Sequence, residues 1–209
     1  VSRLHPLASA RSLGRKVAFR GTEVPVEEAT PEAFEGVDLV LASAGGTVSR
    51  ELLPAAAAAG AVCIDNSSAY RMDPSVPLVV PEVNGASLQG SNSPIIANPN
   101  CSTIQLVLAL APLHRAAGLR KVLVSTYQSI SGAGGEAIRE FATASAARLL
   151  DDQKPDPGQQ RSAFNVLPQI GDFDAEGHSQ EERKMMNEIP KILDHTVPVD
   201  ATCARVPTF

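Results

Sequence analysis

Short apolar runs separated by turn residues fill the first half of the chain. Residues 38–44 form one such run and end at Gly45-Gly46, which predicts a buried strand that enters a tight turn. Residues 61–65 form a second run, and the segment between the two has the composition of a helix. A strand, a helix and a strand within about 30 residues make a βαβ unit, so this pattern predicts a parallel sheet.

The expected helix of this unit carries signals at both ends. Thr47 or Ser49 can cap its start, and Gly60 is a typical C-terminal stop. Pro54 lies inside the helix, so we expect a late start or a kink. The other expected strands are residues 16–19 and 22–26, paired as a hairpin about Arg20-Gly21, and residues 78–80, 95–97, 121–128 and 198–206.

Three helices are expected in the second half of the chain. Apolar residues recur at helical spacing from Ile104 to Leu113. Ser179 and Glu182 form a capping box, the pattern of a helix start. The polar segment 151–160 contains two prolines and is expected to be a surface loop. The expected helices cover residues 102–117, residues 135–150, and the segment from the capping box to about residue 193.

Composition narrows the classes of function. The net charge of −5 argues against a nucleic-acid binder, whose contact face is usually basic. The longest apolar run, residues 52–64, is interrupted by a proline and a glycine and is far shorter than the roughly 18–20 residues that span a bilayer. Cys63, Cys101 and Cys203 form no CxxC pair, which is typical of a reducing, cytoplasmic setting. The histidines stand at no metal-ligand spacing, so no metal site is expected.

The sharpest chemical signal is the segment Asn-Pro-Asn-Cys-Ser-Thr at residues 98–103. It places Cys101 at the start of a long helix, where unpaired N–H groups and the helix dipole stabilise a thiolate and can hold an oxyanion. This arrangement favours covalent catalysis through a thioester or thiohemiacetal. Cys63 and Cys203 lie inside strand-like runs and are expected to be inert. At this point a protease, a thiolase and an aldehyde dehydrogenase all remain open.

Several blocks of the sequence together resemble aspartate-β-semialdehyde dehydrogenase, in that family's order and spacing: SAGGTVS, VVPEVN, NPNCST, STYQSISGAGGEA, AFNVLPQI, EERKMMNE and ATCARVP. The related N-acetyl-glutamyl-phosphate reductase and glyceraldehyde-3-phosphate dehydrogenase carry other residues around their cysteine. The resemblance implies an oxidoreductase that reversibly converts L-aspartate 4-semialdehyde, phosphate and NADP to 4-aspartyl phosphate and NADPH. That reaction serves lysine, threonine, methionine and diaminopimelate biosynthesis, and the source is expected to be bacterial.

The resemblance also implies roles for individual residues. Cys101 matches the nucleophile, while Arg71 and Lys184 match two phosphate ligands, and two cations suit a dianion. Lys184 stands one helical turn from Glu181, so a plain ion pair is the alternative for this lysine. Arg205 matches a clamp for the substrate α-carboxylate. Because an unpaired arginine in an apolar strand is costly, a bound anion or a buried partner is expected there.

Further matches concern the substrate and the cofactor. Glu181 matches a contact to the substrate amino group, and Gln128 matches a substrate-binding glutamine. Arg11 resembles a residue that meets the adenosine ribose phosphate, and an arginine there favours NADP over NAD. The expected cofactor-binding residues are Arg11, Ser12, Ser43, Gly45, Gly46, Ser131 and Gly132.

Two family features have no counterpart in the sequence. Residues 1–40 contain no G-x-x-G-x-x-G turn, and the family's catalytic histidine would follow the RVP segment, while His178 and His195 stand in a different context. The expected fold is α/β: a Rossmann-like doubly wound parallel sheet without its first βα unit, followed by part of an α+β substrate and dimerisation domain.

We therefore expect a chain truncated at both ends. The expected domains are an NADP-binding domain over residues 1–99 and a catalytic and dimerisation domain over residues 100–209, each incomplete. The full-length enzyme is expected to be a homodimer or homotetramer, and the chain by itself is expected to be inactive. The alternative is a non-catalytic dehydrogenase-like binding or assembly protein, or an inactive fragment. The enzyme is favoured by the joint presence of Cys101, Arg71, Lys184, Glu181 and Arg205.

Overall fold

The computed structural model describes residues 1–150, 163–193 and 196–209, and the chain divides into two units, Val1–Leu108 and Ala109–Phe209. The loop expected at residues 151–160 lies outside the described residues, as does His195. In the described residues, no helix is long and apolar enough to cross a membrane.

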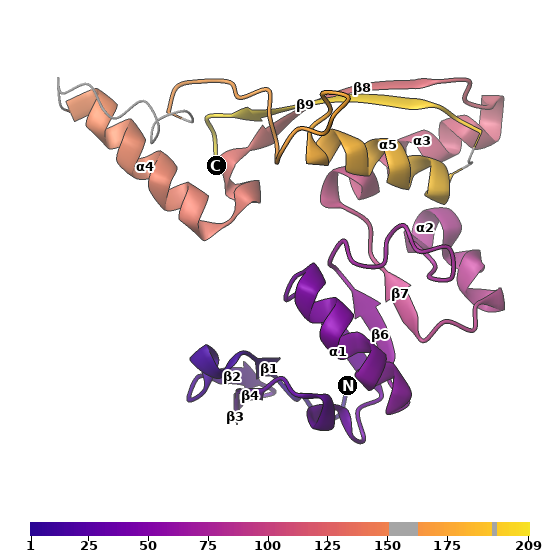
Figure 1. Cartoon of the computed structure of the whole chain (residues 1–209), viewed down its shortest axis with the longest axis vertical. Helices are drawn as coiled ribbons and strands as arrows, with labels where there is room; N and C mark the ends of the chain where they lie inside the picture. Colours follow the sequence, from indigo (N-terminus) through magenta and orange to yellow (C-terminus); the bar gives the residue numbers. More distant parts are fainter. Residues whose placement is uncertain (151–162, 194–195) are drawn as a thin grey trace. The chain divides into compact units, whose positions relative to one another are not determined.

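A three-stranded parallel sheet forms the core of the first unit (Figure 1). Strand β5 (Leu39–Ala42) leads into α1 (Gly46–Ala58), which returns to β6 (Val62–Asp65), and β7 (Ile95–Ala97) extends the sheet on the other side of β6. The predicted βαβ unit and its parallel pairing are therefore confirmed. Leu53 and Ala56 of α1 are buried together with Cys63 and Ala97 of the sheet, because α1 covers this face.

The start of α1 differs from the expectation. Thr47 and Ser49 do not cap the helix, and the expected late start is wrong, because Gly45 is the N-cap and Gly46 is the first helical residue. Gly45 has φ 96°, a conformation open mainly to glycine, so the chain can turn into the helix two residues earlier. The helix continues past Pro54 and ends at Ala58, close to the predicted stop.

The strand expected at residues 78–80 is reduced to a single parallel bridge between Leu78 and Ala97. The side chain of Asn84 explains the difference, because it accepts a hydrogen bond from the N–H of Val80 and donates one to the carbonyl of Leu78, both at 2.9 Å. These main-chain groups are thus unavailable to a longer ladder. Helix α2 (Pro81–Asn84) begins at the next residue, and η3 (Gly85–Gly90) follows it.

The N-terminal segment contains the predicted hairpin. Strands β2 (Lys16–Phe19) and β3 (Thr22–Pro25) pair antiparallel about Arg20 and Gly21. These two residues have φ 49° and 81°, as a type I′ turn requires. The remaining elements of this segment are β1 (Leu7–Ala8), its parallel partner β4 (Glu27–Glu28), η1 (Ala10–Ser12) and η2 (Pro31–Phe34).

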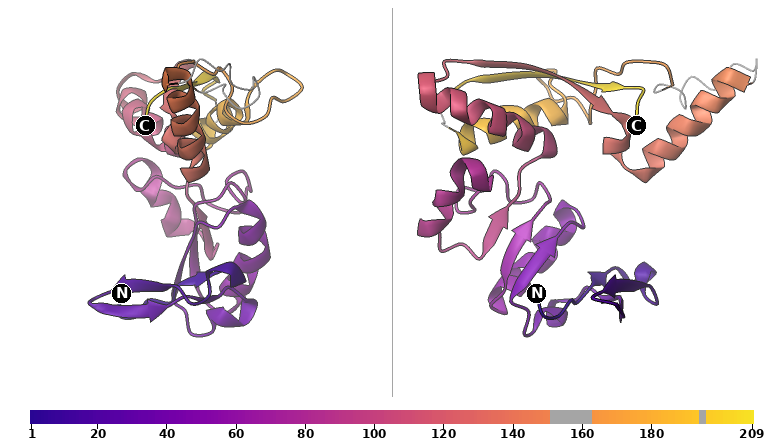
Figure 2. Two further views of the ribbon diagram at one scale, coloured as in Figure 1. Left: turned by 90° about the vertical axis from the view of Figure 1, so that its left-hand side faces the viewer. Right: turned by 180° about the vertical axis from the view of Figure 1, so that it is seen from behind.

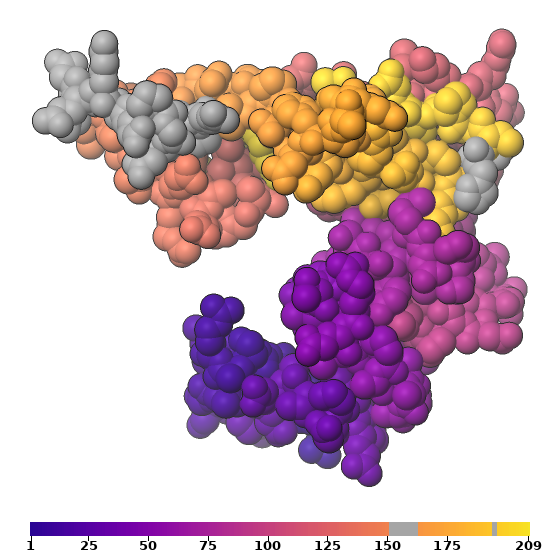
Figure 3. All heavy atoms as spheres, in the orientation of Figure 1, coloured from indigo at the N-terminus to yellow at the C-terminus, as the bar shows by residue number. Residues whose placement is uncertain are grey.

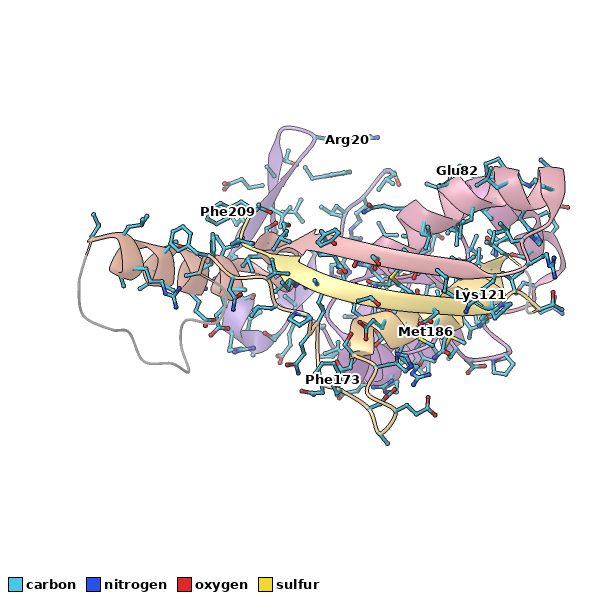
Figure 4. All side chains as sticks on the ribbon, turned by 90° about the horizontal axis from the view of Figure 1, so that it is seen from above. Arg20, Glu82, Lys121, Phe173, Met186 and Phe209 are labelled. Atoms are coloured by element: carbon cyan, nitrogen blue, oxygen red, sulfur yellow. The ribbon has the colours of Figure 1, made fainter. Side chains whose placement is uncertain are left out.

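The second unit is built on two long parallel strands, β8 (Val122–Ser129) and β9 (Val199–Val206), paired along their whole length (Figures 2 and 4). Helix α5 (Gln180–Ile192) packs on one face, where Met185, Ile189 and Cys203 are inaccessible to solvent. The predicted second-half helices are confirmed to within about one residue: α3 (Cys101–Ala117), α4 (Gly135–Leu150) and α5. A short η4 (Ile130–Ala133) joins β8 to α4.

Two further contacts complete the second unit. Segment 163–178 (orange in Figure 3) lies against β9 and α5 and forms an antiparallel bridge between Leu167 and Arg205. The rings of Phe141 on α4 and Phe209 meet edge to face with their centres 5.2 Å apart. This contact attaches α4 to the chain that follows β9.

Candidate active site

Cys101 lies at the first residue of α3, directly after the turn that follows β7, and its side chain is exposed. Asn100 organises this helix start, because its carbonyl accepts from the N–H of Ile104 at 2.9 Å. The Asn100 Oδ1 also accepts from the N–H of Cys101 at 2.9 Å and from its thiol at 3.5 Å. The predicted position of the cysteine at a helix start is therefore present, with a reachable thiol.

The other two cysteines differ from Cys101 in burial. Cys63 and Cys203 are both inaccessible to solvent. Burial raises the pKa of each thiol, and nearby Asp65 adds to the effect at Cys63. Because a thiol reacts as its thiolate, these two cysteines are poor nucleophiles.

Arg71 is buried and fastened to the main chain around the Cys101 turn. Its Nε donates to the carbonyl of Asn98 at 2.9 Å, and its Nη2 donates to the carbonyl of Asn66 at 3.0 Å. Asn98 Nδ2 donates to Asn66 Oδ1 at 2.8 Å, which closes the arrangement. Arg71 is thus not the solvated surface charge that an arginine usually is. We call Asn66, Arg71, Asn98, Asn100 and Cys101 the α3 cluster.

A buried carboxylate supports the loop that carries Arg71. Asp65, at the end of β6, is inaccessible to solvent and accepts hydrogen bonds from the Ser49 hydroxyl at 2.8 Å, the Ser67 N–H at 2.9 Å and the Ser67 hydroxyl at 2.7 Å. Ser67 Oγ in turn accepts from the N–H of Ala69 at 3.1 Å. The hydrogen bonds of Asp65 therefore fix the loop's first turn against α1.

The residues expected at the cofactor fall into separate places. Ser43, Gly45 and Gly46 line the turn between β5 and α1, at the carboxyl end of a parallel strand. Ser43 Oγ accepts from Asn66 Nδ2 at 3.3 Å, which connects this turn to the α3 cluster. Arg11 and Ser12 lie on η1, and the exposed guanidinium of Arg11 has no hydrogen-bond partner among the described residues.

In the second unit, one hydrogen-bonded chain joins three of the predicted substrate and phosphate ligands. Gln128 Nε2, on β8, donates to Glu181 Oε1 at 3.2 Å. Lys184 Nζ donates to the other oxygen of the same carboxylate, also at 3.2 Å, so the i, i+3 ion pair is formed. Thr126 holds Gln128 from the other side at 2.9 Å. Glu181 is 5% exposed, and its carboxylate is therefore fixed within the fold.

Arg205 lies on β9 directly opposite Gln128 in the strand register. Its Nη1 donates to the carbonyl of Ser129 at 2.8 Å, and both residues are half-buried. A Cβ placed on Gly132 would lie 2.8 Å from Nη1, so the guanidinium occupies space that only glycine leaves open. Ser131 is hydrogen-bonded to Ser129, its hydroxyl 2.7 Å from that of Ser129. We call Gln128, Gly132, Glu181, Lys184 and Arg205 the α5–β9 cluster.

Comparison with known proteins identifies the family. Two family profiles match the chain, namely Semialdehyde dehydrogenase, NAD binding domain, over residues 1–91, and Semialdehyde dehydrogenase, dimerisation domain, over residues 110–209. The aspartate-semialdehyde dehydrogenase of Bacillus subtilis (strain 168) is 51% identical over 210 residues, which cover 96% of this chain and 60% of the relative. The chain belongs to the aspartate-semialdehyde dehydrogenase family.

Solved members of the aspartate-semialdehyde dehydrogenase family share the fold. The enzyme II of Vibrio cholerae, complexed with ASA, matches with a TM-score of 0.92 and 44% identity over 100% of this chain and 63% of its own. The Candida albicans enzyme, solved with NADP, matches with a TM-score of 0.68 and 26% identity over 99% and 61%. The predicted α/β fold, with an NAD-binding and a dimerisation domain, is confirmed. The chain spans about three fifths of the length of these relatives.

The polar contacts around the α3 cluster were not predicted from the sequence. Asn66 and Asn98 contribute through a contact between loops far apart in the sequence, and Asp65, which supports the loop that carries Arg71, is an acidic residue at a strand end. Asn100 does carry a local signal, because an asparagine before a helix start is a typical cap. Among the described residues, no group of three or more His, Cys, Asp or Glu side chains could hold a metal ion.

Proposed function

We propose that the protein carrying this chain is an aspartate-semialdehyde dehydrogenase. It converts L-aspartate 4-semialdehyde, phosphate and NADP⁺ to 4-aspartyl phosphate, NADPH and a proton, and the reverse. The observation that carries the proposal is the exposed thiol of Cys101 at the start of α3, within a chain that belongs to this family. The Vibrio cholerae relative was solved in complex with ASA, which supports aspartate semialdehyde as the substrate.

In the biosynthetic direction, the thiolate of Cys101 attacks the acyl carbon of 4-aspartyl phosphate. A carbon–sulfur bond forms, the carbon–oxygen bond to phosphate breaks, and phosphate leaves with its electron pair. We propose that the positive end of the α3 helix dipole stabilises the oxyanion that develops on the acyl oxygen. A hydride from NADPH reduces the resulting thioester, after which the carbon–sulfur bond breaks and the thiolate of Cys101 is restored.

The remaining residues bind the substrate. Arg71 and Lys184 are proposed to hold the phosphate, with Arg71 already oriented by the carbonyls of Asn66 and Asn98. Arg205 is proposed to bind the substrate α-carboxylate, and Glu181, with Gln128 bound to it, the amino group. Main-chain carbonyls hold Arg71 and Arg205, and an ion pair holds Glu181 and Lys184 to each other. This fixation of the charges before substrate arrives supports these roles, since little reorganisation is then needed.

The chain's residues fit a dinucleotide. The start of α1 after Gly45 presents unsatisfied N–H groups at the carboxyl end of β5, where dinucleotide phosphates bind in such folds. The residues proposed to hold NADP are Arg11, Ser12, Ser43, Gly45, Gly46, Ser131 and Gly132. The NADP-bound Candida albicans relative and the exposed Arg11 support NADP. Arg11→Ala should raise the KM for NADP about tenfold or more and leave the KM for NAD nearly unchanged, and equal changes would contradict this role.

Several wider statements also belong to this proposal. We propose domains over residues 1–99 and 100–209, a homodimer or homotetramer through the dimerisation domain, and a cytoplasmic location. The absence of disulfides among the three cysteines supports a reducing compartment.

The deciding experiment measures phosphate-dependent formation of NADPH from aspartate semialdehyde by the protein that carries this chain. Cys101→Ala should abolish turnover and the acyl-enzyme detected by mass spectrometry after acid quench. Cys63→Ala and Cys203→Ala are the matched controls, because both remove a buried thiol, and both should retain turnover. A Cys101→Ala variant with full activity would refute the proposal.

A further inference from the structure

Glu182 connects two elements that carry the α5–β9 cluster. Its Oε2 accepts from the N–H of Ser179 at 2.6 Å, at the start of α5. Its Oε1 leaves the helix and accepts from the N–H of Cys203 in β9 at 2.8 Å. The residue is 7% exposed. A capping box includes the bond from the Ser179 N–H to the glutamate, but not the bond from the Cys203 N–H. The second bond therefore has another role, which is to join α5 to β9.

The Glu182–Cys203 bond closes a ring of main-chain contacts. Two residues further along the same edge of β9, Arg205 exchanges hydrogen bonds with Leu167 at 2.8 and 2.9 Å. The segment after Leu167 returns to α5, where the N–H of Glu181 donates to the carbonyl of Ile170 at 3.1 Å. The ring therefore contains the main chain of both Glu181 and Arg205, and Glu182 is its direct link from helix to strand.

We propose that Glu182 is a positioning residue of the dehydrogenase: by binding the N–H of Cys203, it sets the separation between Glu181 and Arg205. This inference rests on the proposed function, in which these two side chains bind the amino group and the carboxylate of one substrate. Those two groups are attached to the same carbon atom, so their protein partners tolerate little displacement. A misplacement of about 1 Å can cost about a hundredfold in rate.

The charge state of Glu182 suits this role. Burial opposes ionisation of the carboxyl, but the N–H groups of Cys203 and Ser179 outweigh it, so the pKa of Glu182 lies below its ordinary value. The carboxylate is therefore ionised at neutral pH and accepts both bonds. In Glu182→Gln the side chain keeps its size, but its NH₂ group would face a main-chain N–H, and one of the two bonds is lost.

The first test follows the thiol of Cys203, which is buried against Met185, the two sulfur atoms being 3.7 Å apart. Of the three cysteines in this chain, only Cys101 should react quickly with a thiol reagent such as DTNB in the native wild-type protein. Glu182→Gln should make Cys203 reactive by freeing α5 from β9. Cys63 is an internal control, because it is equally buried in the other unit and should stay protected. Protection of Cys203 in the variant would overturn the link itself.

The second test measures kinetics in the active protein that carries this chain. Glu182→Gln should raise the KM for aspartate semialdehyde about tenfold to hundredfold, with the KM for NADP changed less than about twofold. Ser179→Ala is the matched control, because it weakens the same helix start but leaves both carboxylate bonds, and it should leave this KM unchanged. If Glu182→Gln fails to fold, Glu182→Asp, which keeps the charge but is too short to reach both N–H groups, takes its place.

The outcomes separate the two proposals. A wild-type protein without semialdehyde activity would refute the proposed function and, with it, the role of Glu182, and the thiol measurement would then report on a purely structural link. An active wild type in which Glu182→Gln and Ser179→Ala have equal KM values would refute the positioning role alone.

Discussion

Helices α3 and α5 both begin at polar residues, but the two starts differ in their access to solvent. We call the start of α5 closed because its capping side chains are buried, and the start of α3 open because Cys101 is exposed. At α5, Ser179 and Glu182 bind each other reciprocally, and the carboxylate continues to β9. At α3, Asn100 binds the first N–H and the thiol of Cys101, which nevertheless stays exposed. The closed start holds charged side chains in fixed positions, while the open start leaves a nucleophile that a carbonyl carbon can approach.

The largest effect is expected when the open start is disturbed. Asn100→Ala removes the acceptor that holds both the N–H and the thiol of Cys101. Turnover with aspartate semialdehyde should fall about tenfold to hundredfold because the nucleophile loses its orientation. Steady-state kinetics measure this, and thermal unfolding should show that the variant still folds. Wild-type kcat and KM values in this variant would mean that the cap does not orient the thiol.

A smaller effect should follow from crowding Arg205. Gly132→Ala places a Cβ about 2.8 Å from Nη1 and pushes the guanidinium away from the carbonyl of Ser129. The KM for aspartate semialdehyde should rise about tenfold, the equivalent of one charged hydrogen bond. Gly135→Ala is the control, because no atom lies within 4 Å of the added carbon. Similar KM values in the two variants would show that Arg205 tolerates displacement.

Ser179→Ala should separate stability from activity. Loss of this cap should lower the free energy of unfolding by about 0.5–1 kcal/mol, as measured by urea titration. Turnover should stay within about twofold of the wild type, because Glu182 keeps its bond to Cys203. The comparison between the two helix starts fails if this variant loses as much turnover as Asn100→Ala.

The smallest expected effect is on the free energy of unfolding at acidic pH. The pKa of Glu182 in the folded chain lies below its ordinary value of 4.5, since its main-chain hydrogen bonds outweigh burial and the charge of nearby His178 assists. Its stabilisation is therefore complete above pH 4.5 and is lost as the pH falls through the folded pKa. Urea titrations at several acidic pH values should show a shallower loss of stability in Glu182→Gln than in the wild type. Parallel curves would contradict the assigned shift.

The elements were predictable wherever the signal was local. The βαβ unit follows from apolar runs between glycines, and the capping box located α5, since Ser179 and Glu182 carry the pattern within one turn. The start of α1 was predicted too late because Gly45 itself is the N-cap, and the strand at residues 78–80 was overpredicted because of a side chain four to six residues further along the chain. Asn84 takes the main-chain groups of Leu78 and Val80, and no propensity of the segment itself reveals this.

The candidate site was predictable only in part, because most of its contacts join residues far apart in the sequence. The spacing of Glu181 and Lys184 indicated their ion pair, which the structure forms. The contact of Gln128 with Glu181 joins positions 53 residues apart, and that of Arg205 with Ser129 joins positions 76 apart. Such pairs depend on the tertiary fold, so their functional roles came from family resemblance and stay predictions.

The parallel ladder of β8 and β9 has a consequence for the order of folding. Its register joins Val122 to Val199, so most of the second unit has to be brought into a closed loop before the first rung forms. Closing that loop costs chain entropy, and only the contacts of the completed sheet offset this cost. Helices α4 and α5 consist of local contacts and can form early, whereas we expect the ladder to form late. Substitutions along β9 should then accelerate unfolding more than they slow refolding.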